Sequence, residues 1–108
     1  MKDRELIEAA AKAAGMRGRW HADYGFNLRT DEWPNIWNPL TNDGDALRLA
    51  VKLQMDVFVR TDQWTEAVGP MVKVQREPHG TGNALAATRR AIVRAAAAMA
   101  EKRVLGAA

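Results

Sequence analysis

The segment from Trp37 to Leu53, WNPLTNDGDALRLAVKL, constrains the fold more than any other part of this chain. A loop with tryptophan and proline ends there at a polar cluster, and apolar residues then recur at helical spacing. Asn42 or Thr41 is suited to cap a helix, because a side-chain oxygen can accept a free N–H of the first turn. Asp43 and Asp45 lie where the helix dipole favours negative charge. The predicted helix buries one stripe, formed by Ala46, Leu49, Ala50 and Leu53.

The length of 108 residues fits a single domain, residues 1–108, in which 47% hydrophobic residues supply a modest core. No apolar run approaches the roughly 18 residues that cross a bilayer, and no signal-peptide pattern is present, so we expect a soluble, intracellular protein with no membrane partner. Cysteine and serine are both absent. This excludes disulfides, thiolate zinc sites, and cysteine or serine nucleophiles. The net charge of +3 favours an anionic partner only weakly.

Helical periodicity also marks both ends of the chain. Residues 3–14 combine helical spacing with acidic residues in the first turn and Gly15 as a stop. A final helix should begin after Asn83 or Thr81, either of which can cap it, and run to about Lys102. Its expected inner face comprises Leu85, Thr88, Ile92, Ala95, Ala96 and Met99.

Alternating β-branched and aromatic residues predict strands in the rest of the chain. One short strand is expected over 17–22, followed by a long irregular connection to Leu40. A β-meander follows the central helix, and its third strand places Val72 and Val74 on one face. The three strands of the meander are expected at 55–60, 63–68 and 71–76. The predicted fold class is therefore α+β, an antiparallel sheet of about four strands covered by three helices.

Two segments of the chain resemble a known family. WNPLTNDGDALRLAVKL, and ATRRAIVRAAAAMA about thirty residues later, are similar to small phage and prophage proteins described as the phage α/β/α sandwich family. The beginning, MKDRELIEAAAKAAG, is similar too. The resemblance implies a three-layer sandwich, helix over sheet over helix, and a phage or prophage protein in the cytoplasm of a bacterial host. It implies no settled activity, and residues 20–36 match no part of the family pattern.

Tryptophans of the central loop are the first candidate binding residues. Trp33 and Trp37 precede the central helix, and exposed indoles anchor interfaces or stack on bases. Burial beneath the loop is the competing interpretation. Burial is favoured for Trp37 and also for Trp64, while Trp33, beside Asp31 and Glu32, stays open between the two.

Arginines of the last helix are the second candidate set. Arg90 and Arg94 are four residues apart and share an outer face that is suited to contact phosphates, with Arg89 beside them. The alternative is an ordinary solvated face. The order of elements from Asp43 onwards also matches that of a double-stranded RNA-binding domain. However, residues 83–88 carry no charge, whereas such domains place a basic cluster at the start of the last helix.

The cluster Asn42, Asp43 and Asp45 resembles a fragment of a calcium loop, which needs oxygen ligands at alternate positions. Only two carboxylates are present, and the closing glutamate of such a loop is missing. Helix capping explains the same residue types and is the preferred interpretation. We therefore expect no metal site here.

Catalytic and cofactor signals are weak elsewhere. His21 and His79 belong to no metal-ligand spacing, and the glycines of HGTGN lack the lysine of a phosphate loop. An enzyme would require Glu66 to converge with Asp62 or His79 in a pocket. We expect no cofactor and no catalytic set.

Two hypotheses about function follow. The first is a non-catalytic phage accessory protein, a module that binds an unknown host or phage protein through a sheet edge or the loop 20–39. The second is a nucleic-acid-binding accessory protein that uses the arginine face of the last helix. An enzyme is a third and less favoured class. A homodimer through the alanine-rich faces 9–14 and 95–98 is also considered.

Overall fold

The computed structural model describes residues 1–29, 35–60, 62–80 and 83–107, with side chains up to residue 102. Its helices are α1 (Asp3–Ala13), α2 (Asp43–Lys52) and α3 (Ala84–Ala107). Its strands are β1 (Gly18–His21), β2 (Gly25–Leu28), β3 (Asp56–Arg60), β4 (Trp64–Val68) and β5 (Gln75–Pro78). All strand pairs are antiparallel. The predicted α+β class and the three predicted helices are confirmed.

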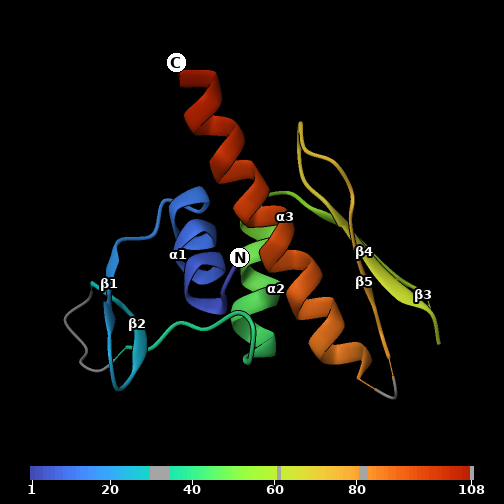
Figure 1. Ribbon diagram of the computed structural model, residues 1–108, viewed down its shortest axis with the longest axis horizontal. Helices are drawn as coiled ribbons and strands as arrows, with labels where there is room; N and C mark the ends of the chain where they lie inside the picture. The colour runs from blue at the N-terminus through green and yellow to red at the C-terminus, as the bar shows by residue number, and fades with distance from the viewer. Residues whose placement is uncertain (30–34, 61, 81–82, 108) are drawn as a thin grey trace.

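The strands form two sheets, whereas the sequence predicted one. Strands β1 and β2 make a hairpin, and β3, β4 and β5 make a separate sheet in that order. Figure 1 shows the hairpin and the three-stranded sheet at opposite sides of the molecule, with the helices between them. The chain passes from β2 to β3 through α2, which packs against α3, so a helix separates the two groups of strands. The described elements therefore do not form the expected sandwich of helix over one sheet over helix.

The core consists mainly of alanine. Helix α1 packs along α3. Ala10 of α1 and Ala91 and Ala95 of α3 are completely buried. Of the 21 buried apolar residues in the described part of the chain, 13 are alanine. Small side chains let two helix backbones approach closely. Most alanines of the two faces considered for a homodimer are buried inside the subunit, and the homodimer itself stays a prediction.

The start of α2 matches its prediction. The backbone N–H of Asp45 donates to Oδ1 of Asn42 at 2.9 Å, so Asn42 is the cap. Asp45 Oδ2 accepts from the N–H of Asn38 at 3.0 Å, and Oδ1 accepts from Arg48 at 2.8 Å. These oxygens hold the loop against the first turn of the helix. The polar cluster therefore builds the joint, as capping predicted.

Helix α3 covers one face of the three-stranded sheet. Thr65 and Ala67 of β4 point to the helix and are fully buried. The cap of α3 is Asn83, whose Oδ1 accepts from the N–H of Ala86 at 3.2 Å. Ile92, Ala95 and Ala96 are buried as predicted, but Leu85 is 66% exposed. Leu85 lies in the first turn of α3, where no described element covers its side chain.

Strand β5 begins later than predicted. Residues 71–74 form a loop, Val74 is half exposed, and Met71 has a positive φ of 63° that continues the turn after Pro70. The ladder pairs Ala67 with Gln75 and Thr65 with Glu77. That register brings Glu77 to Arg90 and Arg94 of α3.

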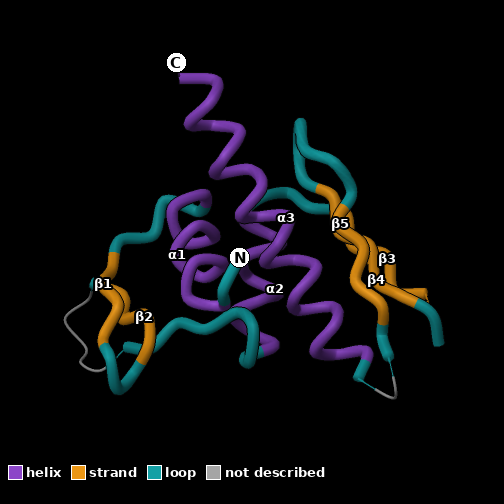
Figure 2. Tube along the Cα trace, in the orientation of Figure 1, coloured by secondary structure: helices purple, strands orange, loops and turns teal. Residues whose placement is uncertain are grey.

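Strand β2 lies where the sequence predicted an irregular connection. Gly25 closes the turn after β1 with φ +84°, a conformation that glycine adopts without strain. Phe26 and Trp37 meet edge to face, with ring centroids 6.0 Å apart, and the N–H of Trp37 donates to the carbonyl of Phe26 at 2.8 Å. Residues 35–42 are thereby tied to the hairpin, and Figure 2 shows this segment running from beside β2 to α2.

Candidate functional site

Arg89, the first of the predicted binding arginines, is committed to a contact within the protein. Its Nε donates to the carbonyl of Leu40 at 2.7 Å, and its Nη1 lies 2.6 Å from Asp43 Oδ1. The side chain is only 18% exposed. Arg89 thus connects α3 to the loop before α2.

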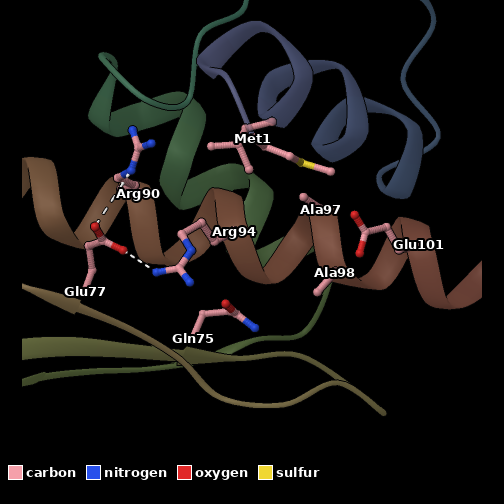
Figure 3. A pocket seen from close by; sticks show the side chains of 9 residues that line it. Met1, Gln75, Glu77, Arg90, Arg94, Ala97, Ala98 and Glu101 are labelled. Carbon is pink, nitrogen blue, oxygen red and sulfur yellow. Dashed lines mark hydrogen bonds and ion pairs between the residues drawn. The ribbon is translucent and has the colours of Figure 1, made fainter.

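Arg90 and Arg94 face the sheet and are paired with acids. Arg94 Nη1 lies 2.5 Å from Glu77 Oε2, while Arg90 lies 3.7 Å from Glu77 Oε1 and 3.1 Å from Asp3 Oδ1. Figure 3 shows both arginines directed at Glu77, beside a cavity of about 360 Å³. Glu101 also lines this cavity, so its charges are mixed. The predicted arginine face is largely neutralised by the protein's own carboxylates.

The predicted burial of the tryptophans is met at one position and not at another, and a third position is not described. Trp37 is 4% exposed, in the core, as the burial interpretation predicted. Trp33 lies outside the described residues. Trp64 is half-buried, but on the side of the sheet away from α3, so its predicted place in the core was wrong. Its ring lies between Arg60 and Arg76, at 5.9 and 4.4 Å from the guanidinium carbons.

The residues considered for catalysis do not converge. Glu66 belongs to the open face of the sheet, where Trp64 Nε1 donates to it at 2.7 Å and Arg76 lies 2.8 Å away. The Trp64 hydrogen bond, followed by the contacts with Arg76, lowers the pKa of Glu66 below its ordinary value of 4.5. His79 is buried on the other face, with Nε2 2.8 Å from Oγ1 of Thr65. Across the described residues, no three acidic or histidine side chains gather as a metal site.

Three arginines on the β1–β2 hairpin form a surface that the sequence interpretation missed. Arg19 lies opposite Asn27 in the ladder, and the N–H of Arg29 donates to the carbonyl of Arg17 at 2.9 Å. Residues opposite each other in an antiparallel pair point to the same face, and so do alternate residues of one strand. Arg17, Arg19 and Arg29 therefore share one face of the hairpin. We call these three residues the hairpin arginine face.

The hairpin is held in place by its other face. Trp20, Phe26 and Leu28 alternate with the arginines and pack toward the core. Gly18 lets the two strands meet, because an added Cβ would lie 2.3 Å from the carbonyl oxygen of Asn27. The arginines are consequently presented outward on a fixed support. They line a cavity of about 650 Å³ together with Met16, Gly18, Asn27 and Leu28.

Ion pairing distinguishes the hairpin arginine face from the other arginines. Every other arginine whose side chain is described lies within 4.0 Å of a carboxylate: Arg4, Arg48, Arg60, Arg76, Arg89, Arg90 and Arg94. The three hairpin arginines are exposed and make no such pair within the described part of the chain. The signal in the sequence was the spacing of Arg17 and Arg19 on a predicted strand. Arg29 could not be added, because its strand was not predicted.

Comparisons with known proteins identify no relative: no family model, curated protein or solved structure matches this chain. The resemblance to phage sandwich proteins thus stays a prediction. Within the described residues, no helix combines the length and the apolar character needed to cross a membrane.

Proposed function

We propose that this chain is a non-catalytic accessory protein that binds the phosphate backbone of nucleic acid through the hairpin arginine face. The observation that carries the proposal is the grouping of Arg17, Arg19 and Arg29 on one exposed face, without acidic partners among the residues that the structure describes. The segments WNPLTNDGDALRLAVKL and ATRRAIVRAAAAMA support a phage or prophage origin, and hence action in the bacterial cytoplasm.

The chemistry of arginine favours phosphate as the ligand. A guanidinium donates two parallel hydrogen bonds to phosphate oxygens, and it is never deprotonated near neutral pH. Arg17 and Arg19 are two residues apart on one strand, and Arg29 lies across the ladder from Arg17. The face therefore offers several neighbouring donors, as a chain of phosphates requires. The hairpin arginine face consists of arginines alone and includes no aliphatic residue of the kind that inserts into a membrane.

Such binding is expected to be independent of sequence and dependent on salt. Contacts to phosphate release counterions, and each contact contributes a slope of about −0.7 to −0.9 to log K against log salt. Three contacts predict a slope of about −2 to −3. Contacts of Arg17, Arg19 and Arg29 with phosphates alone would not distinguish one base sequence from another.

Fluorescence anisotropy with labelled single-stranded and duplex DNA and RNA tests the proposal. The variant Arg17→Gln/Arg19→Gln/Arg29→Gln should lose the salt-dependent binding. The control is Lys12→Gln/Lys52→Gln/Lys73→Gln, which removes the same charge from exposed positions elsewhere. Equal losses in both variants, or a wild-type protein that binds none of the four probes at low salt, would contradict the proposal.

A second candidate function, binding of a partner protein, is favoured by the open face of the three-stranded sheet. Phe58 is 53% exposed there, next to the stack of Trp64 with Arg60 and Arg76. Tryptophan and arginine dominate the binding energy of protein interfaces. The sequence led to the same class of partner, but through a sheet edge or the loop 20–39.

Photo-crosslinking in bacterial cells separates this candidate from the first. A crosslinking amino acid at Phe58 should capture one discrete protein, whereas the same group at Leu47, which is 64% exposed on α2, should not. A product of twice the chain mass reports self-association and not a partner. The same pattern of products at both positions would argue against a specific partner on the sheet.

A further inference from the structure

Strand β3 has an open edge. It pairs with β4 on one side, and no described strand pairs with its other side. Figure 1 shows β3 at the outer margin of the sheet, away from the helices. Phe58 and Val59 in the middle of the strand are 53% and 55% exposed. An exposed apolar edge is a template for pairing with another chain, and soluble proteins usually protect it.

The free hydrogen-bonding groups of this edge belong to Val57 and Val59. The carbonyl of Arg60 accepts from the N–H of Gln63 at 3.1 Å, within the turn to β4, so it points toward β4. Backbone groups alternate in direction along an antiparallel strand. Phe58 therefore bonds toward β4 like Arg60, and Val57 and Val59 direct their N–H and C=O groups outward.

The strand has the sequence DVFVR, with an acidic residue at one end and a basic residue at the other. When two copies run antiparallel, each acidic end therefore meets a basic end. We propose that β3 pairs antiparallel with β3 of a second copy of this chain, with Phe58 opposite Phe58 of the partner subunit. Asp56 then lies opposite Arg60 of the partner subunit, and Arg60 opposite Asp56 of the partner subunit. Val57 and Val59 form the hydrogen-bonded pairs between them. The interface is isologous, so each contact occurs twice and the association closes as a dimer.

The charges of Asp56 and Arg60 favour this register over the alternative registers. A shift of two residues in one direction brings Asp56 opposite Asp62, and a shift in the other brings Asp56 opposite Phe58. A parallel pairing would place Asp56 beside Asp56 and Arg60 beside Arg60. Shifts of one residue turn the side chains to the wrong face of the sheet. Only the centred antiparallel register forms two ion pairs.

The residues at both ends of β3 are free to make these pairs. Asp56 is exposed and has no ion pair within the described residues. Arg60 is 55% exposed and lies 3.8 Å from Glu66, a loose contact. The opposite edge of the sheet is less suited to pairing, because β5 has the polar sequence QREP and ends in a proline.

The dimer joins two three-stranded sheets into one of six strands. Because the two-fold axis of an antiparallel strand pair stands perpendicular to the sheet, both copies of α3 lie on the same face. The exposed middle of β3 is covered. The inference stands on β3 alone and does not depend on binding of nucleic acid.

Charge reversal provides the test. Sedimentation velocity over a concentration series reaching about 1 mM, a range that resolves a weak Kd, should show the wild-type chain in a monomer–dimer equilibrium. Asp56→Arg gives an edge with two positive ends, and Arg60→Asp gives one with two negative ends. Each variant alone should raise the dimer Kd about tenfold or more, because attractive opposed pairs become repulsive.

Mixing the two variants should restore the dimer as a heterodimer, since a positive edge then meets a negative one. A restored heterodimer shows that both variants are folded. It also shows that the weaker homodimers do not result from lost Arg60 contacts within the monomer. Val59→Pro, which removes an outward N–H, should abolish the dimer while circular dichroism stays that of the wild type. A wild-type chain that is monomeric throughout the series, or a mixture no more dimeric than its components, overturns the proposal.

Discussion

Replacement of Arg89 by alanine tests the assignment of this residue to structure. Its guanidinium gives a charged hydrogen bond to the Leu40 carbonyl at 2.7 Å from a side chain that is 18% exposed. Hydrogen bonds to charged groups contribute about 1.5–3 kcal/mol. The ion pair adds little, at most about 1 kcal/mol, because Asp43 is 65% exposed. We therefore expect Arg89→Ala to lower the free energy of unfolding by about 2 kcal/mol.

Urea unfolding followed by tryptophan fluorescence measures this loss. With an m-value of about 1–2 kcal/mol/M, the midpoint should fall by about 1–2 M. Arg90→Ala is the matched control, because Arg90 is 38% exposed and its bonds go to acidic side chains alone. It should cost no more than about 1 kcal/mol. Asp43→Asn, which keeps the shape of the side chain, should also cost less than Arg89→Ala.

Two results would refute the reasoning. If Arg89→Ala cost no more than Arg90→Ala, the bond to the Leu40 carbonyl would not hold the loop to α3. If Asp43→Asn cost as much as Arg89→Ala, the ion pair and not the carbonyl would be the main contact. The first result would make the arginines of α3 candidates for a partner again.

Three further predictions follow from contacts described above. Gly18→Ala should destabilise the protein by about 1–3 kcal/mol or more, measured by thermal unfolding, because its Cβ would meet backbone 2.3 Å away. Trp64→Phe should raise the pKa of Glu66 toward 4.5, as seen by NMR titration of its carboxyl carbon, since the largest cause of the lowered pKa is the indole hydrogen bond. The stability that Glu66 contributes in the wild type is present above pH 4.5 and is lost as pH falls through the lowered pKa, so this pH dependence should shrink in the variant. Ile92→Ala should cost about 2–5 kcal/mol, whereas Leu85→Ala, on the same side of α3, should cost under about 0.5 kcal/mol in urea unfolding.

The elements that could be predicted are those whose signals are local. The cap at Asn42, the apolar stripe that follows it and the glycine stop of α1 are all determined by neighbouring residues, and each is found in the structure. Leu85 shows the limit of periodicity. Its spacing gave the correct side of the helix, but only the fold determines whether another element lies opposite that turn.

The candidate site was harder to predict, because ion pairing joins residues far apart in the chain. Arg90 meets Asp3 across most of the sequence, and Arg94 meets Glu77 only through the register of β5. The grouping of Arg17 with Arg29 depends on the pairing of β1 with β2, and the sequence predicted no strand at β2. Charge counted along a helix therefore could not show which arginines are paired with the protein's own acidic residues.

The alanine-rich core determines which kinds of substitution this protein can tolerate. In a core of leucine and phenylalanine, most harmful substitutions remove atoms and leave a cavity. Here the fully buried Ala10, Ala91 and Ala95 have almost no side chain to lose, and every replacement except glycine adds volume to a packed core. Mutation at these positions is thus expected to destabilise the fold mainly by forcing packed elements apart. Adaptation of the chain should therefore concentrate in the hairpin and the sheet, where side chains can grow into solvent.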